Sequence, residues 1–208
     1  MIPKYSINVD PSLPTSAIYE LPGDEDISDE GFGYFRETWR VSDDREDAIR
    51  VIANEVEALR WIDRKSRSGA EFERMARAIE ADDKDLLLDN FGAEFHDNEI
   101  SDLFEEDDFS ILEGLELGVA GLSHALNSIG CVTAASCRGH ISKNSWSPYP
   151  VVFFATTRDV ADCLVPMVRD SGCGFDDASD RGNLIAIDAP SIANTINLAQ
   201  LIVSRAKV

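Results

Sequence analysis

The chain is short of positive charge. Its 208 residues hold 19 lysines and arginines against 39 aspartates and glutamates, a formal net charge of −20. Residues 1–110 carry 30 acidic and 12 basic side chains, whereas residues 111–208 carry 9 and 7. A field of this sign repels nucleic-acid phosphates and anionic membranes and attracts basic protein surfaces or cations. We therefore expect no DNA binding through the acidic half, which serves either solubility or docking to a basic protein partner.

Long apolar runs and closely spaced cysteines are also missing. The first 16 residues contain no apolar stretch that could form a signal core, and no segment approaches the length of a membrane span. The four cysteines lack the density of a secreted disulfide scaffold. The chain has no P-loop, no dinucleotide fingerprint and no H-E-x-x-H helix. These absences predict a cytoplasmic protein with no membrane association and no cofactor.

The N-terminal half divides into two parts. Residues 1–33 contain four prolines and little periodicity, which is typical of an extended arm. Residues 34–110 predict an acidic, mainly helical region. Its first helix is expected to begin at a cap on Ser42, and a second is expected over residues 70–80. One or two further short helices are expected before the acidic run Glu105–Asp108, which marks a hinge or an exposed bend.

Residues 111–208 predict an α+β domain. Ser110 and Glu113 match a capping box, which would open a helix over residues 111–129. The period then changes to that of short strands alternating with helices. The expected strands are residues 131–136, 151–157, 174–178 and 184–188, and the expected helices are residues 159–169 and 191–205. The order from residue 111 is helix, strand, strand, helix, strand, strand, helix.

This order is itself a repeat. Gly130-Cys131 precedes the first strand pair, as Gly172-Cys173 precedes the second, and the turn Ser136–Gly139 recurs as Ser179–Gly182. Two copies of a helix-strand-strand unit would place their strands in one antiparallel sheet with the helices on one face. Chance similarity is the alternative to duplication.

The two copies differ after the glycine of the turn, where the first copy inserts His140–Pro150. Polar, aromatic and basic side chains gather in this loop, as they do in functional loops on rigid scaffolds. Arg138 would bind an anionic group in bidentate fashion. The alternative is a simple hairpin turn, with Cys137 buried and Arg138 on the surface. The candidate ligand-binding residues are Ser136, Cys137, Arg138, Gly139, His140, Trp146 and Tyr149.

The same residue types also occur in zinc sites and in nucleophilic catalysis. Cys137 and His140 form a C-x2-H pair, with Cys131, Cys173 and His124 as remote partners for zinc. Structural zinc normally needs two close pairs, so we expect no metal. Cys137 and His140 are also the candidate catalytic residues, as nucleophile and base. No complete set of nucleophile, base and orienting group can be assembled, which favours a protein that is not an enzyme.

The motif also carries a resemblance. The stretches Leu126–Thr133, Ser136–His140 and Pro150–Phe153 are similar to a pattern in uncharacterised bacterial and phage proteins with an S-C-x-G-H element. More distantly, this element resembles the S-C-S-G-R segment of the wybutosine-synthesis methyltransferase family, which implies binding of S-adenosylmethionine and a modified tRNA. Arg138 and His140 stand where that family has serine and arginine. From this resemblance we expect a binding site at these residues, but not the reaction of that family.

Three functions follow from these observations. The first is a binding module that holds a small polar or anionic ligand, or a peptide, at the loop after Ser136–His140. The second is an acidic partner-binding protein, such as an antitoxin-like or immunity-like protein or a subunit of a bacterial defence complex. The third is an enzyme that depends on Cys137 and His140, or an S-adenosylmethionine-dependent RNA methyltransferase.

Overall fold

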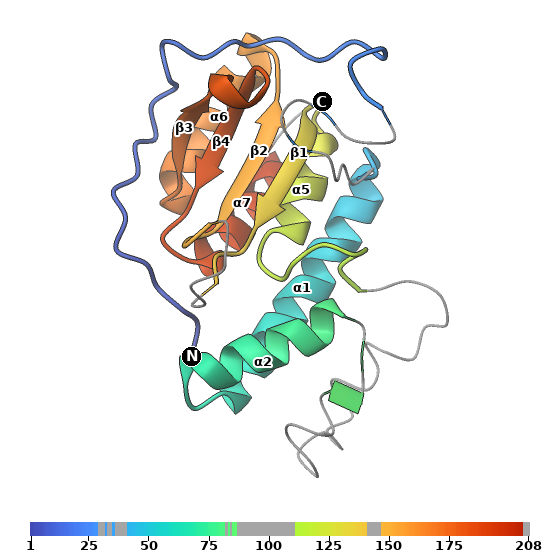
Figure 1. Cartoon of the computed structure of the whole chain (residues 1–208), viewed down its shortest axis with the longest axis vertical. Coiled ribbons are helices and arrows are strands. Elements are labelled where there is room, and N and C mark those ends of the chain that lie inside the picture. Colours follow the sequence, from blue (N-terminus) through green and yellow to red (C-terminus); the bar gives the residue numbers. More distant parts are fainter. Residues whose placement is uncertain are drawn as a thin grey trace.

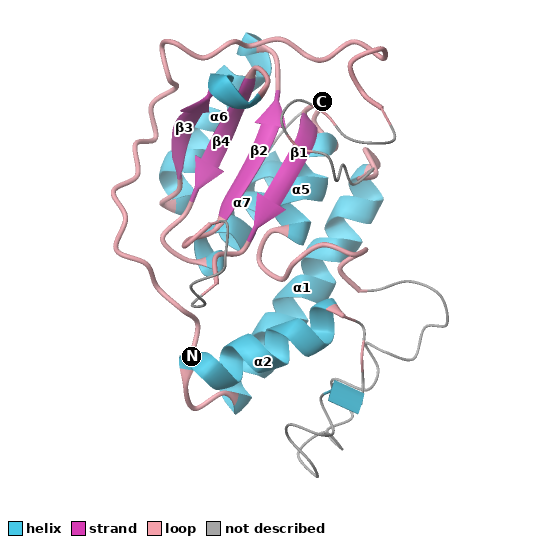
Figure 2. Cartoon of the chain, viewed as in Figure 1, coloured by secondary structure: helices cyan, strands magenta, loops and turns pink. Residues whose placement is uncertain are grey.

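The described part of the chain forms a four-stranded antiparallel sheet with helices packed on it (Figure 1, Figure 2). The structure is a computed structural model, which describes residues 1–28, 32, 35, 41–81, 83, 85–86, 111–140 and 147–205. The helices are α1 (Arg45–Lys65), α2 (Gly69–Glu80), α5 (Ala120–Asn127), α6 (Arg158–Ser171) and α7 (Ile192–Arg205). The strands are β1 (Val132–Cys137), β2 (Val151–Ala155), β3 (Gly174–Ala178) and β4 (Leu184–Asp188), with a 3₁₀ helix over Ser179–Arg181. The expected α+β fold class is confirmed.

The sheet order is β1-β2-β4-β3, and every neighbouring pair is antiparallel. The unit α5-β1-β2 is followed by a second unit, α6-β3-β4, and β2 lies beside β4 at the centre. A glycine of positive φ follows the helix of each unit, Gly130 at 85° and Gly172 at 75°. A buried cysteine, Cys131 or Cys173, comes next in both. This arrangement agrees with the duplicated unit that the sequence predicts.

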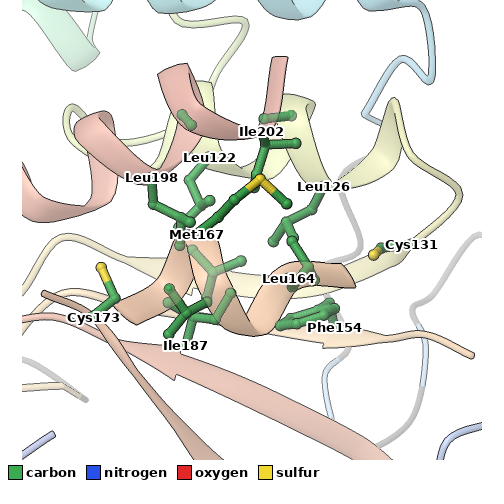
Figure 3. Packing of buried hydrophobic residues seen from close by; sticks show 14 of the residues in the cluster. Leu122, Leu126, Cys131, Phe154, Leu164, Met167, Cys173, Ile187, Leu198 and Ile202 are labelled. Atoms are coloured by element: carbon green, nitrogen blue, oxygen red, sulfur yellow. The ribbon is translucent and has the colours of Figure 1, made fainter. Parts of the chain in front are cut away.

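One face of the sheet is covered by α5, α6 and α7 (Figure 3). All five residues of β2 are buried, because apolar side chains project from both faces of this central strand and are covered on each side. The layer between the sheet and the helices is filled by Leu122 and Leu126 of α5, Leu164 and Met167 of α6, Leu198 and Ile202 of α7, and Phe154 and Ile187 of the central strands. Removal of this apolar surface from water is the main force that holds the helices on the sheet.

The second face of the sheet has a thinner cover. Val151, Phe153 and Ala186 belong to a smaller apolar cluster, against which Ile27 and Phe35 from the N-terminal part of the chain pack. The ring centroids of Phe35 and Phe153 are 5.1 Å apart. Because no described α-helix lies on this face, part of it is open, and a hollow forms there.

The N-terminal arm protects the edge of the sheet. Residues 1–27 contain no helix or strand and pass along β3 (Figure 1). The Phe175 N–H donates a hydrogen bond to the Asp10 carbonyl at 2.7 Å, and the Ser16 hydroxyl donates to the Asp177 carboxylate. An exposed edge strand can pair with another chain, so the arm covers a surface that would otherwise favour aggregation.

Helices α1 and α2 share a core with the C-terminal elements. Trp61, Phe72 and Met75 lie in one buried cluster with Leu117 and with Ile196 of α7. The acidic half is therefore joined to the sheet domain through apolar packing, which is the main favourable term in folding. None of the helices that the structure describes is both long and apolar enough to cross a membrane.

The N-terminal helices lie close to their predicted positions. Helix α1 begins later than expected, because Asp44 caps it, while the Ser42 hydroxyl donates to the Asp47 carboxylate at 2.7 Å. An ionised carboxylate matches the positive end of a helix better than a neutral hydroxyl does. The helix expected over residues 70–80 is confirmed as α2. The short helices expected after it and the acidic run Glu105–Asp108 lie almost wholly outside the described residues.

The prediction of a helix over residues 111–129 was wrong in its first half, because α5 begins only at Ala120. Glu113 and Gly118 have φ values of 51° and 93°, which a right-handed α-helix excludes, so residues 111–119 form turns instead. The expected cap, Ser110, lies outside the described residues.

Glu55 of α1 binds the start of α5. This side chain is fully buried, and its carboxylate accepts hydrogen bonds from the Gly118 N–H at 2.7 Å and the Gly121 N–H at 3.2 Å. Both amides would otherwise be unpaired at the start of a helix. A Cβ on Gly121 would lie 3.3 Å from the Ile52 Cα and closer still to the Glu55 carboxylate. Gly121 therefore permits the close approach of the α1 backbone.

Replacement of Glu55 by alanine should destabilise the whole fold. The change leaves buried amides without a partner, and we expect the free energy of unfolding to fall by about 2–3 kcal/mol. Glu57→Ala is the matched control, because Glu57 lies on the same helix but is exposed. Chemical denaturation of both variants provides the measurement. Equal stability of the two variants would contradict the capping role of Glu55.

Candidate functional site

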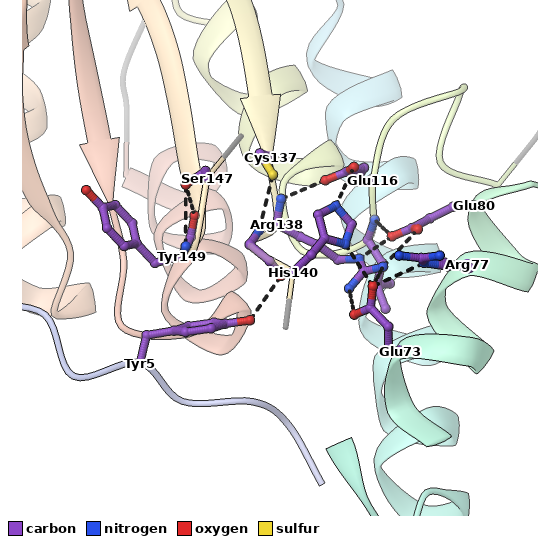
Figure 4. Close-up of polar contacts among 12 residues, drawn as sticks. Tyr5, Glu73, Arg77, Glu80, Glu116, Cys137, Arg138, His140, Ser147 and Tyr149 are labelled. Atoms are coloured by element: carbon purple, nitrogen blue, oxygen red, sulfur yellow. Dashed lines mark hydrogen bonds and ion pairs between the residues drawn. The ribbon is translucent and has the colours of Figure 1, made fainter. Parts of the chain in front are cut away.

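The Ser136–His140 element lies at the end of β1, next to helix α2 (Figure 4). Gly139 has a φ of 75°, and a Cβ there would lie 2.5 Å from the backbone of Tyr149. Glycine is therefore needed at position 139 for the two ends of the loop between β1 and β2 to meet. The Tyr5 hydroxyl donates a hydrogen bond to the Gly139 carbonyl at 3.0 Å. The element thus stands where the arm, the sheet and the acidic half meet.

Arg138 is buried, with only 2% of its surface exposed. Its Nη1 lies 2.6 Å from Glu73 Oε2, and its Nε lies 2.6 Å from Glu80 Oε1. The two glutamates are seven residues apart, so both project from one face of α2. The hairpin-turn alternative, which places Arg138 on the surface, is therefore wrong on this point. A planar guanidinium can engage two carboxylates at once, and the acidic half supplies both.

The ion pairs also fix the charge of Glu73. Burial alone would raise the pKa of Glu73, but hydrogen bonding and the positive charge of Arg138, together with His140, lower it to about 2. The side chain is therefore a carboxylate at neutral pH. Arg77, four residues further along α2, adds a contact of 3.2 Å from its Nε to Glu73 Oε1.

His140 lies between a glutamate of the acidic half and a glutamate of the C-terminal domain. Its Nδ1 lies 2.8 Å from Glu73 Oε1, and its Nε2 lies 3.0 Å from Glu116 Oε1. The other oxygen of Glu116 accepts a hydrogen bond from the Arg138 N–H at 2.8 Å. Figure 4 shows the imidazole ring held between the two glutamates. Three glutamates therefore surround the Arg138–His140 segment.

Cys137 is fully buried in the apolar cluster on the second face of the sheet. Its Sγ accepts a hydrogen bond from the Gly139 N–H at 3.4 Å. A nucleophilic thiol must be reachable by its substrate, so the burial of Cys137 argues against a catalytic role. Cys163 is the exposed cysteine of the four. Burial raises the pKa of both Cys131 and Cys173 to about 12.

The remaining candidate residues do not join this cluster. Ser136 pairs with Val152 in the β1–β2 ladder. The ring of Tyr149 points away from Cys137 and His140 in Figure 4 and lines the hollow on the second face of the sheet. Trp146 lies outside the described residues. The structure therefore groups four of the seven candidates and separates Tyr149 from them.

The hollow has a volume of about 240 Å³. The rings of Tyr149 and Phe153 line it, together with the guanidinium of Arg181, which lies 4.9 Å from the centroid of Phe153. Four aspartates also line it, namely Asp176, Asp177, Asp180 and Asp188. Acidic groups therefore outnumber basic ones four to one among the described lining residues.

Asp188 differs from the other aspartates of the hollow. Burial, with a smaller contribution from the charge of Asp176, raises the pKa of Asp188 to about 6. None of the described residues donates a hydrogen bond to its carboxylate. Asp177, in contrast, is held by the hydroxyls of Ser16 and Ser179. Asp188 is thus a half-buried charge whose partner is not supplied by the described part of the chain.

Sequence reasoning missed the partners of the motif. Glu73 and Glu80 share one face of a helix that was expected over residues 70–80, and this spacing was the one available signal. Glu116 gave no signal, because it was assigned to a helix that does not form there. Asp176 and Asp188 fall in strands predicted from the sequence, but sequence reasoning did not recognise that they share one face of the sheet.

Replacement of Arg138 by methionine should destabilise the protein by about 3 kcal/mol, because Glu73 and Glu80 would lose the buried cation that pairs with both of them. Arg181→Met is a matched control, since Arg181 occupies the equivalent turn of the second unit. There we expect a loss of at most about 1 kcal/mol, the value of a cation–π contact. Urea denaturation of the two variants makes the comparison. A smaller loss for Arg138→Met than for Arg181→Met would contradict the buried ion-pair network.

Comparison with known proteins adds no relative. No family model, no curated protein and no solved structure matches the chain. The resemblance of Ser136–His140 to the wybutosine-synthesis methyltransferase family therefore stays a prediction. A functional proposal is therefore based on the geometry of the cluster around Arg138 and His140 and of the hollow.

Proposed function

We propose that the chain is a small-ligand binding module whose site is the hollow on the second face of the sheet, and that its ligand is a small organic cation. The observation that carries this proposal is the lining of the hollow, where four aspartates face one arginine and two aromatic rings. Concave sites with a few converging polar groups are where ligands bind most often.

The size of the hollow limits the ligand. Its volume of about 240 Å³ falls below the roughly 300–1,000 Å³ of sites for drug-sized molecules. The rings of Tyr149 and Phe153 offer π faces, which attract guanidinium and ammonium groups. Arg181 already lies over Phe153 at 4.9 Å, which supports the suitability of this surface for a cation.

The two carboxylates nearest the sheet supply the charge. Asp176 pairs with Ala186, and Asp188 is two residues beyond Ala186 on β4, so both aspartates project from the same face. Burial, with a smaller contribution from the charge of Asp176, raises the pKa of Asp188 to about 6. A bound cation would stabilise the ionised form of Asp188.

The choice of a cation revises the expectation of an anionic ligand. That expectation depended on Arg138, whose charge is matched by Glu73 and Glu80. The loop after His140 keeps its place in the proposal, because its last residues, Ser147–Tyr149, line the hollow. The alternatives of an acidic partner-binding protein, a cysteine enzyme and an RNA methyltransferase stay predictions from the sequence.

Binding of three probes, methylguanidine, choline and putrescine, tests the proposal by calorimetric titration of the full chain. At least one should bind saturably with a stoichiometry of one. Affinity should rise between pH 5 and pH 7, because Asp188 loses its proton in that range and the ionised form binds the cation. The double variant Asp176→Asn/Asp188→Asn should lose this binding.

A second double variant separates the hollow from general charge attraction. Asp159→Asn/Asp162→Asn removes the same charge from the exposed surface of α6 and should bind like the unmodified chain. Equal weakening in both double variants would mean that the probes respond to net charge alone. That result, or saturable binding by none of the three probes, would contradict the proposal.

A further inference from the structure

A second cluster of polar atoms lies outside the hollow. A ligand atom from each of Glu116, Cys137 and His140 lies within 4.8 Å of the other two. In the part of the chain that the structure describes, no other group of three histidine, cysteine, aspartate or glutamate side chains meets this condition. The residues come from the turns before α5, the last position of β1 and the segment that follows it.

The orientation of the histidine suits a metal ligand. A neutral imidazole has one N–H, and its Nδ1 lies 2.8 Å from Glu73 Oε1, a carboxylate held in turn by Arg138. Donation from Nδ1 leaves the lone pair of Nε2 directed at Glu116 Oε1, at 3.0 Å. Two acceptors then face each other, and either a second proton on the imidazole or a metal cation between them removes this repulsion. A carboxylate on the far nitrogen is also the usual partner of a metal-bound histidine.

The other two ligands are positioned as well. Glu116 Oε2 accepts the Arg138 N–H at 2.8 Å, which leaves Oε1 directed to the cluster. Cys137 Sγ accepts the Gly139 N–H at 3.4 Å, a contact that helps to hold the sulfur in place. The side chains of Glu116 and His140 are 33% and 15% exposed, so an ion can enter from their side.

We propose that Glu116, Cys137 and His140 bind a transition-metal dication of the zinc type. One sulfur, one nitrogen and one oxygen ligand form a set that suits zinc, whereas magnesium and calcium favour oxygen alone. A thiolate and a carboxylate balance the charge of a dication, and the thiol proton leaves as the metal binds. Three protein ligands leave a fourth position open to solvent.

This site differs in its ligands from the zinc site considered in the sequence analysis, which combined Cys137 and His140 with remote partners. Cys131, Cys173 and His124 are the remote candidates there, but none of them lies in the group that Glu116, Cys137 and His140 form. The third ligand is instead Glu116, which lies 21 residues before Cys137. Such a set is visible only in the folded chain.

Titration with Co²⁺ is the test, because a cobalt–thiolate bond gives a near-ultraviolet charge-transfer band. The full chain carries Cys163→Ser, which removes the exposed thiol, and is first treated with a chelator. We expect one equivalent of Co²⁺ to produce the band and one equivalent of Zn²⁺ to abolish it. Cys137→Ser should remove the band, whereas Cys173→Ser, which changes a buried thiol outside the cluster, should retain it.

Glu116→Gln and His140→Gln test the other two ligands. Both side chains are partly exposed, so these variants should fold, which circular dichroism checks. Affinity for Zn²⁺, measured by competition with a coloured chelator, should fall at least about tenfold in each. The proposal is overturned if the band does not form, if it survives Cys137→Ser, or if both glutamine variants bind Zn²⁺ as tightly as the parent. It does not depend on the cation site in the hollow.

Discussion

The buried guanidinium of Arg138 joins the sheet domain to the acidic half, and the geometry of the candidate metal site depends on it. Glu73 and Glu80 of α2 hold the guanidinium from one side, and the Arg138 N–H holds Glu116 from the other. Charges in such positions are costly to remove from water unless each has its partners. The network therefore has one well-satisfied arrangement, and it specifies how α2 lies against the end of β1.

Two separate chemical environments result from the same short loop. On the side of α2, Glu73 orients His140, which faces Glu116. On the open face of the sheet, Tyr149 and the aspartates line the hollow. Gly139 connects the two, because its lack of a side chain allows the loop to return against the Tyr149 backbone. The candidate metal ligands and the aspartate-lined hollow thus lie on opposite sides of Gly139.

Local patterns predicted most of the elements. The helix expected over residues 70–80 is α2, and the strand expected over residues 184–188 is β4, because periodicity and turn residues act over a few positions. The failure at residues 111–119 has a physical cause. Glu55, more than 50 residues away in the sequence, caps α5, and no local pattern reveals such a contact.

The site could be predicted only in part. The sequence predicted the motif around Cys137 and His140, because polar, aromatic and basic side chains are concentrated there. The hairpin-turn alternative placed Arg138 on the surface, because arginine is rarely buried unless it is paired, and the partners of Arg138 lie about 60 residues earlier. Pairing over that distance is a property of the folded chain.

The central claim is that Arg138 acts through its carboxylate partners on α2, and a double-mutant cycle tests it most directly. Arg138→Met, Glu80→Gln and the double variant would be compared with the parent by urea denaturation. The account predicts a coupling free energy of at least about 1.5 kcal/mol, as for residues in one buried network. Effects that add to within about 0.5 kcal/mol would show that the two side chains act independently and would contradict the account.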